Sequence, residues 1–220
     1  MSNQLLNAAR TGFTKSTALS LAKENIVDSI WKAANIEGLG TDLEDVDSIL
    51  RDYALTTKKS EVLFVLNMYD AWDFLFNNLD YNNCWMLLSE LNKIVGYHLI
   101  NRRGELRKSE VYISGTSWAP SIPVESEVYD SIALLNKIED PVDKALSYFC
   151  YLTKAQLFID GNKRVAQLMA NKILIENNIG ILSVPVECLN GFRDNLISYY
   201  ETGIDSTLKN FLKHKCIRYV

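Results

Sequence analysis

The sequence predicts a mainly α-helical fold with a small β element, and three observations support this prediction. The 220 residues include only 4 prolines and 10 glycines, which leaves room for long uninterrupted helices. Apolar residues recur at helical spacing along most of the chain. Hydrophobic residues make up 48% of the chain and charged residues 23%, as in ordinary globular domains. A chain of this length buries roughly 70% of its unfolded surface, so we expect a core that needs no metal or disulfide.

The N-terminal segment is expected to hold two helices. Apolar residues follow helical spacing over residues 16–34, and Gly38 then ends the helix as a C-terminal cap. Thr41 and Glu44 form a predicted capping box, in which the hydroxyl and the carboxylate satisfy two unpaired backbone N–H groups. A second helix should therefore follow, to about Tyr53.

The rest of the chain is expected to be built from helices joined by turns. The predicted helices are residues 61–79, 84–100, 124–138, 140–156 and 162–177. Shorter helical pieces are expected after Pro185. Val111-Tyr112-Ile113, followed by Ser114-Gly115, is the one convincing strand, and the chain from there to Pro123 is expected to be a loop.

The chain is expected to form one compact unit, because it contains no internal repeat and no low-complexity linker. Within that unit, residues 1–56 form an N-terminal helical arm and residues 57–220 form the core domain. The N-terminus lacks the apolar segment of a signal peptide, and no stretch approaches the ~18 uncharged apolar residues of a spanning helix. We therefore expect a cytoplasmic protein.

Charge and cysteine usage exclude further classes of protein. The 23 basic and 27 acidic residues give a net charge of −4, so there is no electrostatic reason to expect nucleic acid or an anionic membrane as the main partner. His98 and His214 are the only histidines, and neither has a nearby Cys or His, so a zinc site is not expected. Buried free thiols, with a disulfide framework as the alternative, are expected at Cys84, Cys150, Cys188 and Cys216.

The informative stretch, residues 156–164, joins two strongly helical segments. Asp160-Gly161-Asn162 is a turn signal, and Lys163 and Arg164 fall in the first turn of the next helix. Cations there oppose the helix macrodipole, but together with free N–H groups they make a concentrated anion site able to hold a polyphosphate. Asp160 beside such a site could carry Mg²⁺, which binds one or two carboxylates plus phosphate oxygens. The alternative is a helix–turn–helix with solvated charges.

This stretch resembles the signature of the Fic/Doc (Fido) family, His-x-Phe-x-Asp/Glu-Gly-Asn-x-Arg. The positions in register are Phe158, Asp160, Gly161, Asn162 and Arg164. Lys163 matches the Asn-Lys-Arg variant of Doc and many Fic relatives. The resemblance extends over about residues 15–215 and implies the Fic helical fold with a small β-hairpin flap.

Two further segments carry the resemblance. Residues 33–38 are similar to the inhibitory motif Ser/Thr-x-x-x-Glu-Gly/Asn of Fic proteins that have an N-terminal autoinhibitory helix, with Glu37 as the inhibitory residue. Residues 110–123 resemble the flap, which docks the target segment beside the motif. The docking residues of the flap would be Val111, Tyr112, Ile113, Ser114 and Gly115.

The resemblance implies an activity and a role for each matching residue. Family members usually transfer AMP from ATP to a Ser, Thr or Tyr hydroxyl of a target protein, whereas Doc transfers phosphate. Asp160 would hold Mg²⁺ against the phosphates, and Gly161, Asn162 and Lys163 would form the phosphate-binding turn. Arg164 would pair with a phosphate and stabilise charge as the bond breaks. Phe158 would be a core anchor that fixes the loop.

One departure concerns catalysis. The catalytic His of the family is Gln156 here. An amide has no basic nitrogen near neutral pH, and general-base catalysis typically contributes about 10²–10⁴-fold, so AMP transfer should be badly slowed. Alternatively, Gln156 is simply the polar end of an apolar helical stripe.

Other departures concern the donor and the inhibition. Lys163 replaces the small Gly of the commonest AMP-transferring motif, so it would crowd an α-phosphate and could favour another donor orientation. Gln167 stands where many relatives carry a second Arg, the usual partner of the inhibitory Glu. Lys163 could substitute as that partner; otherwise Glu37 only closes a helix end, since Ala33 has also lost the hydroxyl of the motif.

The function is left with three alternatives. The first is a cytosolic bacterial Fic-domain protein that binds ATP or another nucleotide with Mg²⁺ and is a pseudoenzyme or a slow or Doc-like phosphotransferase. The second is a protein-interaction module, and the third is an ordinary AMP transferase whose base comes from the target or a water. The partner would be a protein bearing a reactive hydroxyl, and a homo-oligomer is possible.

Residues 101–104 with Arg107 and Lys108 are a solvated loop or a docking surface, and Trp118 is a partner anchor or a cover for the cleft.

Overall fold

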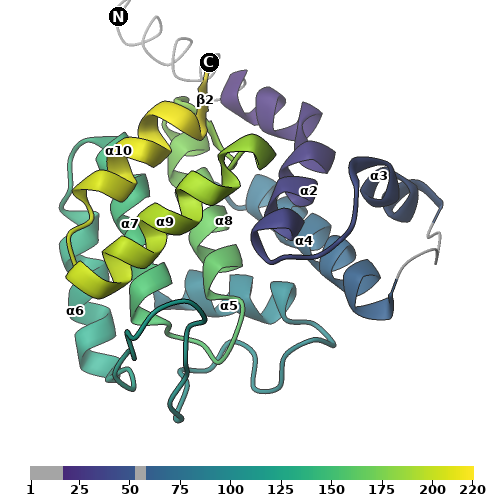
Figure 1. Ribbon diagram of the computed structural model, residues 1–220. Helices are drawn as coiled ribbons and strands as arrows, with labels where there is room; N and C mark the ends of the chain where they lie inside the picture. The colour runs from purple at the N-terminus through teal and green to yellow at the C-terminus, as the bar shows by residue number, and fades with distance from the viewer. Residues whose placement is uncertain (1–16, 53–57) are drawn as a thin grey trace, which may run out of the picture.

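The computed structural model describes residues 17–52 and 58–220, which fold into a helical body with one small sheet (Figure 1). The predicted fold class, mainly α with a small β element, is confirmed. A helix over residues 17–24 precedes α2. The other elements are α2 Ile26–Ile36, α3 Leu43–Asp52, α4 Lys59–Asn77, α5 Trp85–Val95, α6 Glu125–Asn136, α7 Pro141–Ala155, α8 Asn162–Glu176, β1 Gly180–Leu182, η1 Val186–Cys188, α9 Leu189–Thr202, α10 Ser206–Lys215 and β2 Ile217–Tyr219. Ser16 and Tyr53, the expected ends of the first two helices, lie outside the described residues.

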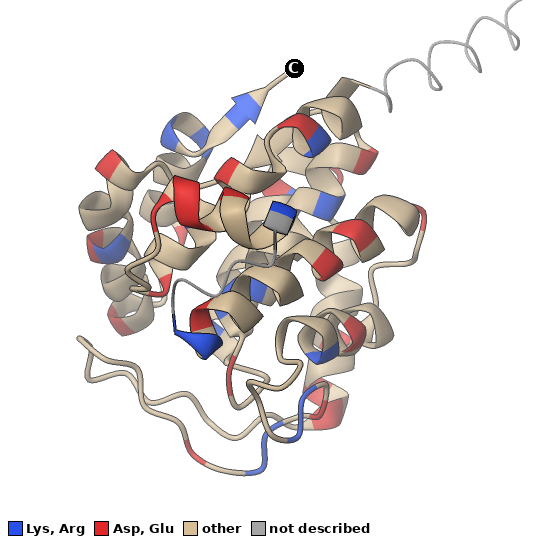
Figure 2. Ribbon diagram, turned by 90° about the vertical axis from the view of Figure 1, so that its right-hand side faces the viewer, with Lys and Arg blue, Asp and Glu red and all other residues tan. Residues whose placement is uncertain are grey.

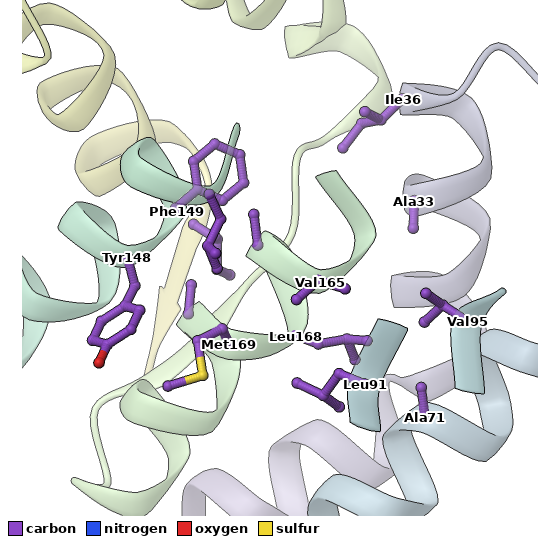
Figure 3. Packing of buried hydrophobic residues seen from close by; sticks show 14 of the residues in the cluster. Ala33, Ile36, Ala71, Leu91, Val95, Tyr148, Phe149, Val165, Leu168 and Met169 are labelled. Atoms are coloured by element: carbon purple, nitrogen blue, oxygen red, sulfur yellow. The ribbon is translucent and has the colours of Figure 1, made fainter. Parts of the chain in front are cut away.

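Helix α8 is the centre of the fold, and all of its residues except Lys163 and Glu176 are buried. It packs mainly on α7, and also on α5, β1 and α4. Figure 3 shows Val165, Leu168 and Met169 of α8 between side chains of α5 and α7. A helix buried on every side has no solvent face, so its polar side chains need partners within the protein.

Most polar groups of α8 find such partners. Asn171 accepts a hydrogen bond from the backbone N–H of Leu182 and donates one to the carbonyl of the same residue. Lys172 pairs with Glu176 and donates to the side chain of Asn83. These bonds tie the sheet and the start of α5 to the central helix, which fixes the direction in which the N-terminus of α8 points.

The N-terminal helices pack against the same core. Ile30, Ala33 and Ile36 of α2 are buried in one continuous apolar cluster with residues of α4 and α8, and α2 contacts α4 (Figure 1). The last turn of α2 is therefore held next to the beginning of α8. The division into an arm (1–56) and a core (57–220) stays a prediction.

The predicted strand over Val111–Ile113 is wrong, because these residues form an extended loop instead. A strand needs a ladder partner, and no backbone hydrogen bond joins residues 111–115 to another described segment. The strands lie elsewhere: β1 and β2 pair antiparallel, with Gly180 opposite Tyr219 and Leu182 opposite Ile217.

The predicted capping box is also out of register by one residue. Asp42 accepts a hydrogen bond from the N–H of Asp45, and Asp45 in return accepts from the N–H of Asp42, so this pair caps α3. Thr41 is instead buried, with its hydroxyl lacking a partner among the described groups. Acidic capping residues also place negative charge near the positive end of the helix dipole.

Candidate nucleotide site

The candidate site lies where α7 ends and α8 begins. Gln156 caps α7 in the left-handed conformation, with φ of 47°, and turns the chain into the loop 157–161. Gly161 ends this loop with φ of +82°. A side chain at Gly161 would meet the Nδ2 atom of Asn92 at 3.0 Å, so glycine is needed here for both its conformation and its size. No described side chain caps the N-terminus of α8.

Asn162 holds the loop in place with its side chain. Its Oδ1 atom accepts the N–H of Phe158 at 2.9 Å, and its Nδ2 atom donates to the carbonyl of Phe158 at 2.8 Å and to Oε1 of Gln156 at 3.0 Å. Phe158 is buried and stacks on Trp85. The side-chain amide of Asn162 is thus occupied within the loop.

Arg164 lies behind the site rather than in it. Its guanidinium donates to the carbonyl of Val95 at 2.9 Å and to Oδ2 of Asp160 at 3.0 Å, and the residue is only 4% exposed. The Nε atom has no hydrogen-bond partner among the described groups and lies 3.9 Å from Oε1 of Glu37. Burial of a guanidinium is tolerated when most of its donors are satisfied and a carboxylate is close.

Glu37 reaches the site from the C-terminal cap of α2. Its Oε2 atom lies 2.9 Å from Nζ of Lys163, and both side chains are largely shielded from water. The sequence left two alternatives for Glu37: it pairs with Lys163, or it only closes a helix end. In the structure Glu37 forms the ion pair with Lys163. Gln167, at the position of the second Arg of the family, is buried, and its Nε2 atom has no partner among the described groups.

Gln156 presents an amide to the site, with both ends already bonded. Its Nε2 donates to the carbonyl of Thr153 at 2.6 Å, and its Oε1 accepts from Asn162. Neither His98 nor His214 lines the pocket, so no histidine takes the place of a base. Tyr200 does line it, but burial and then the charge of Glu37 raise the pKa of its hydroxyl, which disfavours the phenolate.

Arg107 ties the loop at 107–121 to this corner of the molecule. It is 4% exposed and donates to the carbonyls of Ser109, Pro120, Ser121 and Gln156. Both ends of the loop are thereby held by one guanidinium. The expectation that Arg107 belongs to a solvated or docking cluster is wrong, because its side chain is consumed inside the protein.

Trp118 covers part of the neighbouring surface. The Nζ atom of Lys154 lies 4.1 Å from the centre of its ring and donates to the carbonyls of Tyr199 and Tyr200. This cation–π contact joins the loop to the end of α9. Trp118 is half-buried and lines a second hollow beside the loop, so it is packed against the body rather than projecting from it.

A pocket of about 390 Å³ opens over the N-terminus of α8. This volume lies within the ~300–1,000 Å³ range of small-molecule sites. Most of the predicted site residues line it, namely Glu37, Val111, Tyr112, Ile113, Ser114, Gln156, Asp160, Asn162 and Lys163. Gly161, Arg164 and Gly115 do not belong to its lining.

Sequence reasoning missed one wall of the pocket, which α9 supplies. The lining residues from this helix are Phe192, Arg193, Leu196, Ile197 and Tyr200. Their spacing of three and four residues puts them on one helical face, a signal that could have been found in the sequence. Which way that face points could not be found there, because it depends on how α9 packs against α10 and the loop.

Two acidic residues, Glu37 and Asp160, and two basic residues, Lys163 and Arg193, line the pocket, and Figure 2 shows basic and acidic residues interspersed over the described chain. No group of three or more His, Cys, Asp or Glu side chains that could hold a metal occurs in the described ranges. Asp160 alone fits Mg²⁺ bound chiefly through phosphate: its side chain is 64% exposed and lines the pocket.

Across the described residues, no helix is long and apolar enough to cross a membrane.

Comparisons with known proteins agree with this geometry. Residues 85–174, which run from the start of α5 to the last turn of α8, match the model of the Fic/DOC family. The chain contains a Fic/DOC-family segment over this range. The matched segment contains the loop, the Gln156 corner and the α8 N-terminus.

Solved structures of Fic proteins share the fold of the whole described chain. Fic-1 from C. elegans superposes with a TM-score of 0.74 at 20% identity, covering 96% of this chain and 69% of that one. A Fic family protein from Desulfovibrio desulfuricans gives a TM-score of 0.76 at 17% identity, with coverages of 93% and 69%. A Fic domain containing signaling protein from Bacteroides thetaiotaomicron gives 0.71 at 15% identity, with coverages of 94% and 90%. At these identities the likeness extends to the fold only, and no curated protein matches the chain.

Proposed function

We propose that this Fic domain binds ATP or another phosphate-containing nucleotide over the N-terminus of α8, as a relative of protein AMP-transferases with weakened or altered activity. One observation carries the proposal: the uncapped start of α8, with Lys163 in its first turn, opens into a pocket between the loop at 107–121 and α9. Free N–H groups, a positive helix dipole and a lysine form a site that attracts phosphate.

Mg²⁺ would be held by Asp160 together with the phosphates. When bound, the ion would neutralise part of the phosphate charge. Asp160 now accepts the N–H of Gly161 on one oxygen and faces Arg164 on the other. A carboxylate oxygen has more than one lone pair, so these contacts orient the group without preventing it from binding a cation.

In this proposal Glu37 controls whether phosphate can bind at Lys163. Its carboxylate neutralises Lys163 and adds a negative charge to the place where phosphates would lie. A polyphosphate therefore competes with Glu37 for the lysine. Withdrawal of the last turn of α2 would free Lys163 and would also take away the carboxylate that lies 3.9 Å from Nε of Arg164.

Gln156 limits the chemistry. Transfer of AMP joins the hydroxyl oxygen of the target to the α-phosphorus of ATP, breaks the bond to the β-phosphate oxygen and releases pyrophosphate. The hydroxyl proton must go to a base, and the amide of Gln156 does not accept it near neutral pH. With no side-chain base at this position, water would have to take the proton, so transfer to a target Ser, Thr or Tyr would be slow.

A calorimetric titration of Mg-ATP into the wild type and the Glu37→Gln variant tests the proposal. We expect saturable heat in the variant and at least tenfold weaker binding in the wild type, because the variant keeps the shape of Glu37 and removes its charge. Glu44→Gln, an exposed change of equal charge on α3, should behave as the wild type. Absence of heat in all three proteins would reject the nucleotide site. Equal affinity in all three would show that Glu37 does not oppose nucleotide binding.

A second candidate is a protein-interaction module that keeps the fold without the ligand. The observation in its favour is that the two charged pairs, Glu37 with Lys163 and Asp160 with Arg164, already satisfy the motif internally. Such a module would give no heat with Mg-ATP in the Glu37→Gln variant, so the same titration separates the two candidates.

A further inference from the structure

Asn92 is a polar residue on the buried face of α5, with no solvent-exposed surface. Its side-chain amide joins two segments that lie far apart in the sequence. The Oδ1 atom accepts the backbone N–H of Gly104 at 2.7 Å, and the Nδ2 atom donates to the carbonyl of Asp160 at 2.9 Å. One partner only donates and the other only accepts, so a single orientation of the amide satisfies both. The bond to Gly104 therefore holds Asn92 with Nδ2 turned toward the motif.

The bond from Asn92 to the carbonyl of Asp160 determines how the carboxylate of Asp160 is held. That carbonyl belongs to the peptide group between Asp160 and Gly161, whose N–H donates to Oδ1 of Asp160 at 2.6 Å. A planar peptide group turns as a unit, so a carbonyl held by Asn92 keeps the N–H pointed at the carboxylate. Since the side chain of Asp160 is 64% exposed, such contacts are what restrict its rotation.

The last turn of α5 also holds Asp160 by a second route. The carbonyl of Val95 accepts a hydrogen bond from Nη1 of Arg164 at 2.9 Å, and Nη2 of the same guanidinium donates to Oδ2 of Asp160 at 3.0 Å. Each oxygen of the carboxylate thus has one partner, and each partner is anchored on α5. A Cβ at Gly161 would meet Nδ2 of Asn92 at 3.0 Å and Cγ2 of Val95 at 3.4 Å, so the motif loop packs directly on this helix.

We propose that Asn92 is a positioning residue, which holds the carboxylate of Asp160 in the direction in which it can share Mg²⁺ with the phosphates of a bound nucleotide. The inference rests on the proposed nucleotide site and adds the residue that orients its acidic group. Asn92 is buried and does not belong to the lining of the pocket, so it acts through Asp160 and not on the ligand. Its effect should therefore appear in the Mg²⁺ dependence of nucleotide binding.

The test compares the affinity for ATP in Mg²⁺ with the affinity in EDTA, by calorimetry in the Glu37→Gln background. We expect Mg²⁺ to tighten binding about tenfold in this parent protein, and Asp160→Asn to remove most of this gain. Asn92→Leu, which is similar in size, should reduce the gain to less than about threefold and change the affinity in EDTA by less than about twofold. The double variant should lose no more than Asp160→Asn alone, because Asn92 acts through that carboxylate.

Ser89→Ala is the matched structural control. The hydroxyl of Ser89 donates to the carbonyl of Gly104 at 2.7 Å, so this variant also removes a buried hydrogen bond between α5 and the same loop, but it does not touch the motif. It should keep the full Mg²⁺ gain of the parent protein, even where urea unfolding shows a loss of stability. A loss of the gain in Ser89→Ala equal to that in Asn92→Leu would leave Asn92 with a structural role alone and overturn the inference.

A measurement without a substitution at Asn92 covers the case in which Asn92→Leu does not fold. In the NMR spectrum of the Glu37→Gln protein, ATP with Mg²⁺ should shift the side-chain NH₂ signals of Asn92 more than ATP in EDTA does. Asn67 is the internal control, because its side chain donates to the carbonyls of Val95 and Tyr97 and not to the motif. Its signals should show no such difference.

Two further results would overturn the inference: Asn92→Leu keeps the full Mg²⁺ gain, or the Asn92 signals respond equally to ATP with and without Mg²⁺. ATP binding that gains nothing from Mg²⁺ in the parent protein would keep the phosphate site and reject the role of Asn92. Failure of the proposed function is a separate result, in which ATP binds the Glu37→Gln protein neither with Mg²⁺ nor in EDTA, and the inference then falls with it.

Discussion

At the residue scale, Gln156 is the position at which chemistry is expected to fail. Its amide is fixed by Thr153 and Asn162 at the turn where a base would have to stand. Histidine is tolerated at positive φ better than most residues, so the backbone at this position, with φ of 47°, can accept it. The Gln156→His variant can therefore supply the missing base without a change in the backbone of the turn between α7 and α8.

We predict that Gln156→His, introduced with Glu37→Gln, raises AMP transfer at least tenfold, because a positioned base typically contributes about 10²–10⁴-fold. Transfer is measured with ATP labelled at the α-phosphate and a mixture of candidate target proteins. Gln156→Leu in the same background is the control, since it changes the side chain without supplying a base. Equal labelling by the histidine and leucine variants would mean that more than the base is missing.

The cap of α3 gives a second test at this scale. Asp42→Ala should lower the free energy of unfolding by about 1 kcal/mol, because the N–H of Asp45 loses its acceptor. Thr41→Val should cost nothing or stabilise, because it removes a buried hydroxyl without a hydrogen-bond partner. Urea unfolding of both variants checks this, and a larger loss for Thr41→Val than for Asp42→Ala would restore the cap predicted from the sequence.

At the scale of elements, the loop at 107–121 depends on Arg107 instead of on strand pairing. We predict that Arg107→Lys costs roughly 3 kcal/mol of unfolding free energy, because lysine cannot reach the four carbonyls that the guanidinium holds. Lys108→Gln, at the exposed neighbouring position, should change it by less than about 0.5 kcal/mol. Denaturant midpoints of the two variants give the comparison, and similar values for both would show that Arg107 does not hold the loop at 107–121.

The helices could be predicted from the sequence and the loop could not, for physical reasons. Helical bonds are local, so the apolar stripe and turn residues around α7 and α8 place both helices to within one or two residues. The apolar residues Val111 and Ile113 resemble a strand in sequence, but a strand requires a partner, and no described segment makes backbone hydrogen bonds with them. Conversely, β1 and β2 are three residues each, too short for an alternating pattern, and they pair across a long separation.

At the scale of the whole molecule, the site is assembled from four separate parts of the chain: the end of α2, the loop, the motif and α9. The motif residues and Glu37 could be predicted because their identities match a known signature. The partnership of Glu37 with Lys163 stayed open, since it depends on the packing of α2 against the core. That the α9 face with Arg193 turns toward the pocket could not be predicted, because it depends on how α9 packs against α10 and the loop.

The core also predicts how stability depends on pH. Burial raises the pKa of the thiols of Cys150 and Cys216 from 9.0 to about 12. Between pH 9 and 12 the unfolded chain loses these protons and the folded chain keeps them, so each thiol should lower stability by about 1.4 kcal/mol per pH unit. Urea unfolding from pH 7 to 10.5 should show a decline beginning near pH 9 that is shallower in Cys150→Ala. A flat profile would contradict this view of the core.

The central claim, that phosphate binds over the start of α8 once Glu37 is withdrawn, is tested most directly by NMR of the Glu37→Gln variant. Mg-ATP should shift the backbone amide signals of Gly161, Asn162 and Lys163 more than those of any other segment, saturably, and should shift them much less in the wild type. Unchanged signals for these three amides in the variant, or larger shifts in another part of the chain, would contradict the account.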